Sequence, residues 1–119
     1  MCQLKTTFYI LAFVFLCNSL LSQTQAEMNK EAIKSYEKSD LELNNLYKKL
    51  INSIEGNSKT YFIQAQRNWI AFKEQQCKFE ASIYDGGSIQ PLIKFDCLDR
   101  ITKSRISELK EIIDESLPK

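Results

Sequence analysis

Two cysteines in the second half of the chain are the residues best placed to do chemistry. Cys77 and Cys97 lie equally far from Gly87, one on each side of it. In an antiparallel helical hairpin that turns at Gly87, residues equally far from the turn lie at the same level. The spacing therefore predicts a disulfide, which would close a loop of about 20 residues and stabilise the fold by about 3 kcal/mol.

Other reactive side chains are scarce. The chain has no histidine, which removes the commonest general base and the commonest zinc ligand. Glu74 with Glu80, or Asp96 with Asp99, could form an acid/base pair, but such carboxylates are far more often part of a solvated helix face. There is also no glycine-rich phosphate loop. We therefore predict no catalytic residue, no metal site, no cofactor and no enzymatic activity.

The segment Asp85-Gly86-Gly87-Ser88 is a candidate binding loop. A pair of glycines usually serves the geometry of a turn. Exposed loops on rigid, disulfide-linked scaffolds are also where binding sites tend to lie. Both interpretations stay open for this loop.

Three long segments with apolar residues at helical spacing must position these residues. The first has its apolar residues from Met28 to Ile54 and should end near Gly56. The second runs from a Ser58 cap to Ile83, with a stripe of Phe62, Trp69, Phe72 and Phe79 that is more typical of a core than of a ligand groove. Thr24, with Glu27 three residues on, is a candidate cap for the first segment.

The third segment starts at a Ser88 cap and carries Pro91 in its first turn, where a missing N–H costs nothing. Short connections between helices favour antiparallel neighbours. The prediction is an all-α protein, an antiparallel three-helix bundle with one disulfide, preceded by a signal peptide.

Hairpin geometry also predicts a polar cluster. Trp69 and Arg105 are equally far from Gly87, so we expect the guanidinium to stack on the indole. Gln66, Asn68 and Thr102 are the candidate hydrogen-bonding neighbours of Arg105. Around a turn near Gly56, Leu43 lies level with Trp69 and Asn44 with Asn68, so the first helix should close the same cluster.

The N-terminus is typical of an export signal. Lys5 is followed by an uncharged, largely apolar run from Phe8 to Leu21, which fits the central region of a secretory signal and is short for a membrane span. We predict a signal peptide at 1–22, cleaved after Ser22, with Ala26 and Ser19 as alternatives, and a mature domain at 23–119. Lipidation of Cys17 is a minor alternative, and no stable membrane anchor is expected after cleavage.

The mature domain is electrically balanced. Lys5 is the only charged residue among the first 22, which leaves 15 basic and 15 acidic residues in the remainder. Nucleic-acid binding needs a basic stripe, which the totals do not indicate. An exported small domain with an even number of cysteines is also typical of an oxidising compartment, so we expect a periplasmic or secreted protein.

Ordered motifs along the mature chain resemble the family of lysozyme inhibitor LprI N-terminal-like domains of bacterial envelope proteins. They are Thr24-Gln25-Ala26-Glu27-Met28-Asn29, the run from Leu43 to Tyr47, the run from Gln66 to Cys77, and Gly86-Gly87-Ser88-Ile89. The resemblance marks these positions as family-motif residues: Leu43, Asn44, Tyr47, Gln66, Trp69, Cys77, Cys97, Thr102, Arg105 and Leu109.

The resemblance implies an envelope protein that binds and inhibits lysozyme. The alternative is a structural, stress-related or immunity-type envelope module that binds another protein on the same scaffold. The chain departs from the family pattern in two respects. Many members have two further cysteines that flank the Thr24–Asn29 motif, whereas here Ser22-Gln23 precede it and Glu31 stands in the later place. Lys73 stands where arginine is common.

Overall fold

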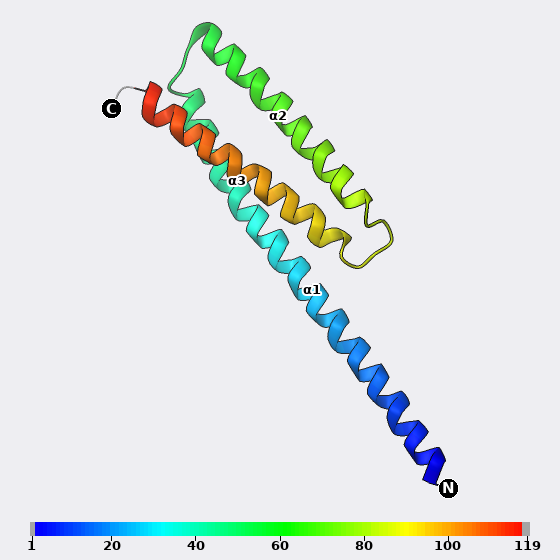
Figure 1. The fold of residues 1–119 in the computed structure, drawn as a ribbon. Helices are drawn as coiled ribbons and strands as arrows, with labels where there is room; N and C mark the ends of the chain where they lie inside the picture. Colours follow the sequence, from blue (N-terminus) through cyan, green and yellow to red (C-terminus); the bar gives the residue numbers. More distant parts are fainter. Residues whose placement is uncertain (1, 118–119) are drawn as a thin grey trace.

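The computed structural model describes residues 2–117, without the side chains of Cys2, Leu21 and Ser22, so the side chain at the favoured cleavage position lies outside the described part. Over this range the chain forms three helices, α1 (Cys2–Ile51), α2 (Gly56–Ser82) and α3 (Gln90–Ser116), and no strand (Figure 1). α2 runs antiparallel to α1 and α3. α3 packs along both other helices, whereas the backbones of α1 and α2 approach each other less and are joined by a few side-chain contacts. The expected all-α class is confirmed.

α1 is one uninterrupted helix, which corrects the predicted start near Thr24. The Thr24 hydroxyl donates to the Leu20 carbonyl at 3.0 Å, four residues earlier in the same helix, so Thr24 is no cap and forms no capping box with Glu27. The physical reason is that no glycine or proline precedes Gly56. Nothing in the apolar segment therefore ends the helix before it reaches the domain.

The N-terminal part of α1 projects away from the other two helices (Figure 1). Residues 3–20 are all exposed, and no other element packs on them in the described chain. By length and composition this stretch could cross a membrane, a test that signal sequences near an N-terminus also pass.

The other predicted caps are also wrong. α1 ends at Ile51, and α2 begins at Gly56, two residues before Ser58. The residue preceding α2 is Glu55 and the residue preceding α3 is Ile89, and neither makes a side-chain capping bond. Ser88 therefore caps nothing. Pro91 does lie in the first turn of α3, as expected.

The core consists of two buried clusters along α3. One joins α1 to α3 through Leu43, Leu50, Ile106 and Leu109. The other joins α2 to α3 through the cysteine pair, Leu98 and Ile101. Trp69 is packed against both clusters, so it connects the two halves of the core.

The prediction that the aromatic stripe of α2 faces the core is partly wrong. Phe62 and Trp69 are half-buried, but Phe72, Phe79 and Ile83 are exposed. The buried residues of α2 are Gln66, Lys73, Cys77 and Ala81. At about 100° per residue, Phe72, Phe79 and Ile83 lie more than a quarter turn from Cys77. Because Cys77 must face Cys97, the disulfide turns these apolar side chains outward.

Removal of the bridge should lower stability markedly. The Cys77→Ser/Cys97→Ser variant is expected to lose about 3 kcal/mol in free energy of unfolding, because the unfolded chain is no longer constrained. Urea denaturation followed by circular dichroism measures this loss. Wild-type protein held in reducing agent should behave like the variant, and an unchanged midpoint in both would contradict the expectation.

Candidate functional site

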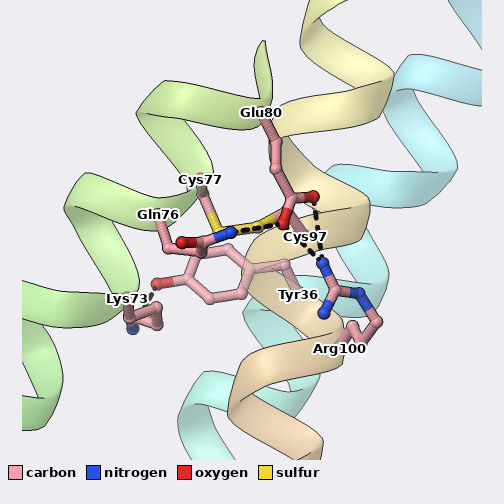
Figure 2. The surroundings of a disulfide bond; sticks show 7 residues. All are labelled: Tyr36, Lys73, Gln76, Cys77, Glu80, Cys97 and Arg100. Atoms are coloured by element: carbon pink, nitrogen blue, oxygen red, sulfur yellow. Dashed lines mark hydrogen bonds and ion pairs between the residues drawn. A yellow bond between two sulfur atoms is a disulfide. The ribbon is translucent and has the colours of Figure 1, made fainter.

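The disulfide is the centre of the α2–α3 contact (Figure 2). Cys77 and Cys97 are bonded, with Cα atoms 5.5 Å apart, as their equal distances from Gly87 predict. Beside the bridge, Arg100 on α3 donates to both carboxylate oxygens of Glu80 on α2 at 2.9 Å. The hydrogen bond from Gln76 and that from Arg100 together lower the pKa of Glu80. The Glu80–Arg100 ion pair, called the Glu80–Arg100 clasp below, therefore links α2 to α3.

Lys73 is buried beneath the disulfide, between two aromatic rings. Its ammonium nitrogen lies 4.8 Å from the Trp69 ring centroid and 5.1 Å from that of Tyr36 on α1. It donates to the Tyr36 hydroxyl at 3.0 Å, and an Asp40 carboxylate oxygen lies 3.9 Å away. Figure 2 shows Lys73 and Tyr36 together below the bridge. Cation–π attraction and this hydrogen bond compensate the burial of the charge.

The expected contact between Trp69 and Arg105 is present. The guanidinium carbon lies 6.0 Å from the indole centroid. The Arg105 Nε donates to Gln66 at 3.2 Å, and Nη1 pairs with Glu108 at 2.8 Å. Of the three candidate neighbours, Gln66 is therefore the hydrogen-bonding partner.

The other motif positions divide into core and surface. Leu43 and Leu109 are buried in the α1–α3 cluster. Tyr47 on α1 stacks on Phe62 of α2, with ring centroids 5.4 Å apart. Asn44 is exposed and bonds to Asp40 on its own helix, so it does not enter the cluster.

Two expected neighbours of Arg105 make no bond to it. Asn68 is exposed and accepts a hydrogen bond from Gln64 on its own helix. Thr102 is fully buried, and among the described residues its hydroxyl has no hydrogen-bonding partner. Thr102 therefore fills space between helices at a cost in desolvation.

Asp99 forms a clamp between α1 and α3 that the sequence analysis missed. Its side chain accepts hydrogen bonds from Ser35 and Ser39 on α1, and pairs with Lys103 at 2.7 Å. Asp99 is only 9% exposed, so it is not part of a solvated helix face, whereas Asp96 is exposed. The overlooked signal was Ser39, a polar residue on the buried line of α1 between Ala32 and Leu43.

The environment of Asp99 favours its charged form. Burial raises the pKa of Asp99, but hydrogen bonds from Lys103, Ser39 and Ser35 outweigh burial and hold the pKa below its ordinary value. Asp99 therefore has a structural role: its ionised carboxylate accepts hydrogen bonds that join α1 to α3.

The candidate loop Asp85-Gly86-Gly87-Ser88 forms an exposed tip between α2 and α3. Gly86 has a φ of 80°, in the left-handed region that favours glycine. The Gly87 N–H donates to the Tyr84 carbonyl at 3.0 Å, and Gln90 donates to the Asp85 carboxylate. These bonds order the tip while leaving it in solvent.

A groove of about 910 Å³ adjoins the tip. Its apolar walls come from Tyr36, Phe95 and Leu98, and the disulfide forms part of its lining. Charged residues of both signs line it as well: Glu74, Lys78, Asp85 and Lys94. Asp85 and Gln90 belong to both tip and groove, so the two form one continuous surface.

This combination suits binding a partner. No group of three or more potential metal ligands occurs among residues 2–117, and the carboxylates with lowered pKa values, Glu80 and Asp99, are engaged in contacts between helices. Groove and tip instead offer apolar walls, charges of both signs and a turn held by the disulfide. Such a surface can bind another molecule.

Comparison with known proteins relates these features to one family. The family model described as Lysozyme inhibitor LprI matches residues 17–109. The uncharacterized protein R02472 of Rhizobium meliloti (strain 1021) is 27% identical over 106 residues, which cover 78% of this chain and 76% of that protein. No solved structure matches significantly.

The clamp at Asp99 predicts acid sensitivity. Because its folded-state pKa is lowered, its contribution to stability is present above the unfolded pKa of about 3.9 and is lost as pH falls through the folded value. Asp99→Asn should lose about 1–3 kcal/mol at pH 7 and show a shallower loss below about pH 4. Urea denaturation from pH 7 to pH 2 measures both effects.

Asp96→Asn is the matched control, since Asp96 is an exposed carboxylate one turn earlier on α3. It should keep nearly the wild-type stability and pH profile. If Asp99→Asn keeps the wild-type profile too, the clamp does not stabilise the fold.

Proposed function

Because the chain belongs to the LprI family of lysozyme inhibitors, we propose that it is an exported envelope protein that binds and inhibits a lysozyme. The observation that carries this proposal is the extent of the family match. It spans all of α2, α1 from Cys17 onward and α3 as far as Leu109. The family's activity is therefore proposed for a match that includes residues of all three helices.

Export is supported by the N-terminal part of α1. Its apolar side chains are exposed along residues 3–20 and contribute nothing to the core clusters. The length and composition of this stretch suit a signal peptide. We propose cleavage after Ser22 and a mature domain at 23–119 in the periplasm or outside the cell, where the disulfide can form.

The tip Asp85–Ser88 and the adjoining groove are the proposed contact surface for lysozyme. The disulfide and the Glu80–Arg100 clasp hold this end of the α2–α3 hairpin, so little order must be gained on binding. Glycines at the tip allow the backbone to approach a narrow cleft closely.

Charge gives this surface a means of recognising the enzyme. Lysozyme cleaves its polysaccharide between two carboxyl groups that flank the scissile bond. Lys78 and Lys94 line the groove beside the tip. Their ammonium groups would pair with carboxylates at the mouth of the enzyme's cleft while the tip blocks entry of the polysaccharide.

An inhibition assay on cell-wall substrate tests the proposal. The purified protein should slow several lysozyme types unequally, with at least one inhibited at micromolar concentration. Lys78→Glu/Lys94→Glu should weaken inhibition by about tenfold or more, corresponding to about 1.4 kcal/mol of binding free energy.

Lys38→Glu is the control, because Lys38 is an exposed lysine of α1 outside the groove. It should inhibit like wild type. Absence of inhibition by wild type across lysozyme types would exclude this activity and favour an envelope module with another protein partner, which a pull-down from envelope extract would identify.

Export makes a separate prediction. Protein recovered from the extracytoplasmic fraction should have the mass of a chain that begins at Gln23, because the apolar segment before it is removed on export. Its Cys77 should be joined to Cys97. Intact-mass and peptide spectrometry measure both features.

Other N-termini would decide between the cleavage sites. A chain that begins at Leu20 would support the alternative site after Ser19, and one that begins at Glu27 would support the site after Ala26. A chain that retains Met1 would contradict cleavage.

A further inference from the structure

The outward face of α2 carries an unpartnered line of large side chains. Tyr61, Phe72, Phe79 and Ile83 are 71%, 56%, 60% and 66% exposed, respectively. At about 100° per residue, all four lie within roughly 40° of one another around the helix. They therefore form one stripe along almost the whole length of α2.

The stripe lies within a face that has no charged residue. The neighbouring positions on this side of α2 are small or neutral: Gln64, Ala65, Asn68, Ala71, Gln75, Gln76 and Ser82. By the same angular reckoning, the charged residues of α2, such as Arg67, Glu74 and Lys78, lie outside this arc. Solvated helix faces normally carry charges, whereas interface cores are depleted of charge and enriched in aromatic residues.

The spacing of the apolar residues indicates the partner. Ala65 and Phe79 each lie seven residues from Phe72, and Tyr61 and Ile83 each lie eleven residues from it. The pattern is thus symmetric about Phe72. In an antiparallel two-fold pairing about Phe72, each of these positions lies level with the equally distant position on the other copy, so apolar side chains face apolar side chains along the stripe.

We propose that α2 pairs antiparallel with α2 of a second copy of this chain, around a two-fold axis beside Phe72. In this pairing Phe72 meets its own copy, Tyr61 lies level with Ile83, and the small Ala65 lies level with the large Phe79. Asn68 lies level with Gln76, which allows hydrogen bonds between amides. No like charges meet along the stripe.

The fold leaves room for this pairing. α2 is an outer helix of the assembly, because α3 lies between it and α1 (Figure 1). Taking 150–250 Å² for each large side chain, the exposed fractions of the four amount to roughly 400–600 Å² per copy. The area buried on both copies together is near or below the low end for specific interfaces, so the dimer is weak and reversible.

Sedimentation equilibrium from about 1 µM to about 1 mM tests the pairing without any lysozyme present, so its outcome is independent of the proposed inhibition. The protein is purified from the cells that produce it, with whatever processing of the N-terminus has taken place there. Wild type should pass from monomer to dimer over this range. Phe72→Glu should weaken dimerisation at least tenfold, because two carboxylates would meet at the axis.

Arg67→Glu is the matched control, since it places a new carboxylate on the same helix outside the stripe, and it should dimerise like wild type. Phe79→Glu provides a second test if Phe72→Glu loses the helical circular dichroism of the wild type. A wild type that stays monomeric, or glutamate variants that fold and dimerise normally, would overturn the proposal. The proposal would also be overturned if the protein stayed monomeric and the glutamate variants lost lysozyme binding.

Discussion

The bond between Cys77 and Cys97 determines which side of α2 faces the rest of the molecule. A helix with apolar residues on more than one side could pack in several orientations, and hydrophobic burial alone would turn its aromatic stripe inward. The covalent constraint selects another face, which brings Gln66 and Lys73 inside and leaves Phe72 and Phe79 in solvent. The polar interior and the apolar exterior of this helix thus have one cause.

A polar interior needs internal partners, and the structure supplies nearly all of them. Lys73 has Tyr36 and Trp69, Gln66 has Arg105, and Asp99 has two serines and a lysine. Such buried networks stabilise less than an apolar core of equal volume, because desolvation offsets much of the attraction. They do require particular neighbours at particular levels, so a helix that slid by one turn would leave charges buried and unpaired. We infer that they set the register of the bundle more than they add to its stability.

Much of this arrangement follows from simple reasoning about levels and periods. Equal distances from Gly87 correctly place Cys77 against Cys97 and Trp69 against Arg105, because a short turn leaves two antiparallel helices little freedom to slide. Helical periodicity also correctly places Leu43 and Leu109 in the core. The group around Arg105 could be predicted in part, with Gln66 correct and Asn68 wrong.

The remaining features depend on information that local patterns lack. An apolar stripe has the same period whether it faces a core or solvent, so periodicity alone misassigned Phe79. The predicted disulfide carried the missing signal, because Phe79 lies nearly opposite Cys77 around the helix. Ser58 and Ser88 are good caps by type, but turn geometry begins each helix elsewhere. The Asp99 clamp joins residues 60 and 64 positions apart, so no local pattern reveals it.

The central position of α3 has a consequence for the order of folding. Contacts between α2 and α3 cross a short turn, whereas those between α1 and α3 link distant parts of the chain, as Ser35 and Asp99 show. Loop closure favours the nearer contacts, so the α2–α3 hairpin should form early and α1 should dock onto it later. Most of the contacts of α1 are with α3, and a few side chains, Tyr36 on Lys73 and Tyr47 on Phe62, join it to α2 as well. The last helix of the chain thus serves as the template on which the first one is assembled.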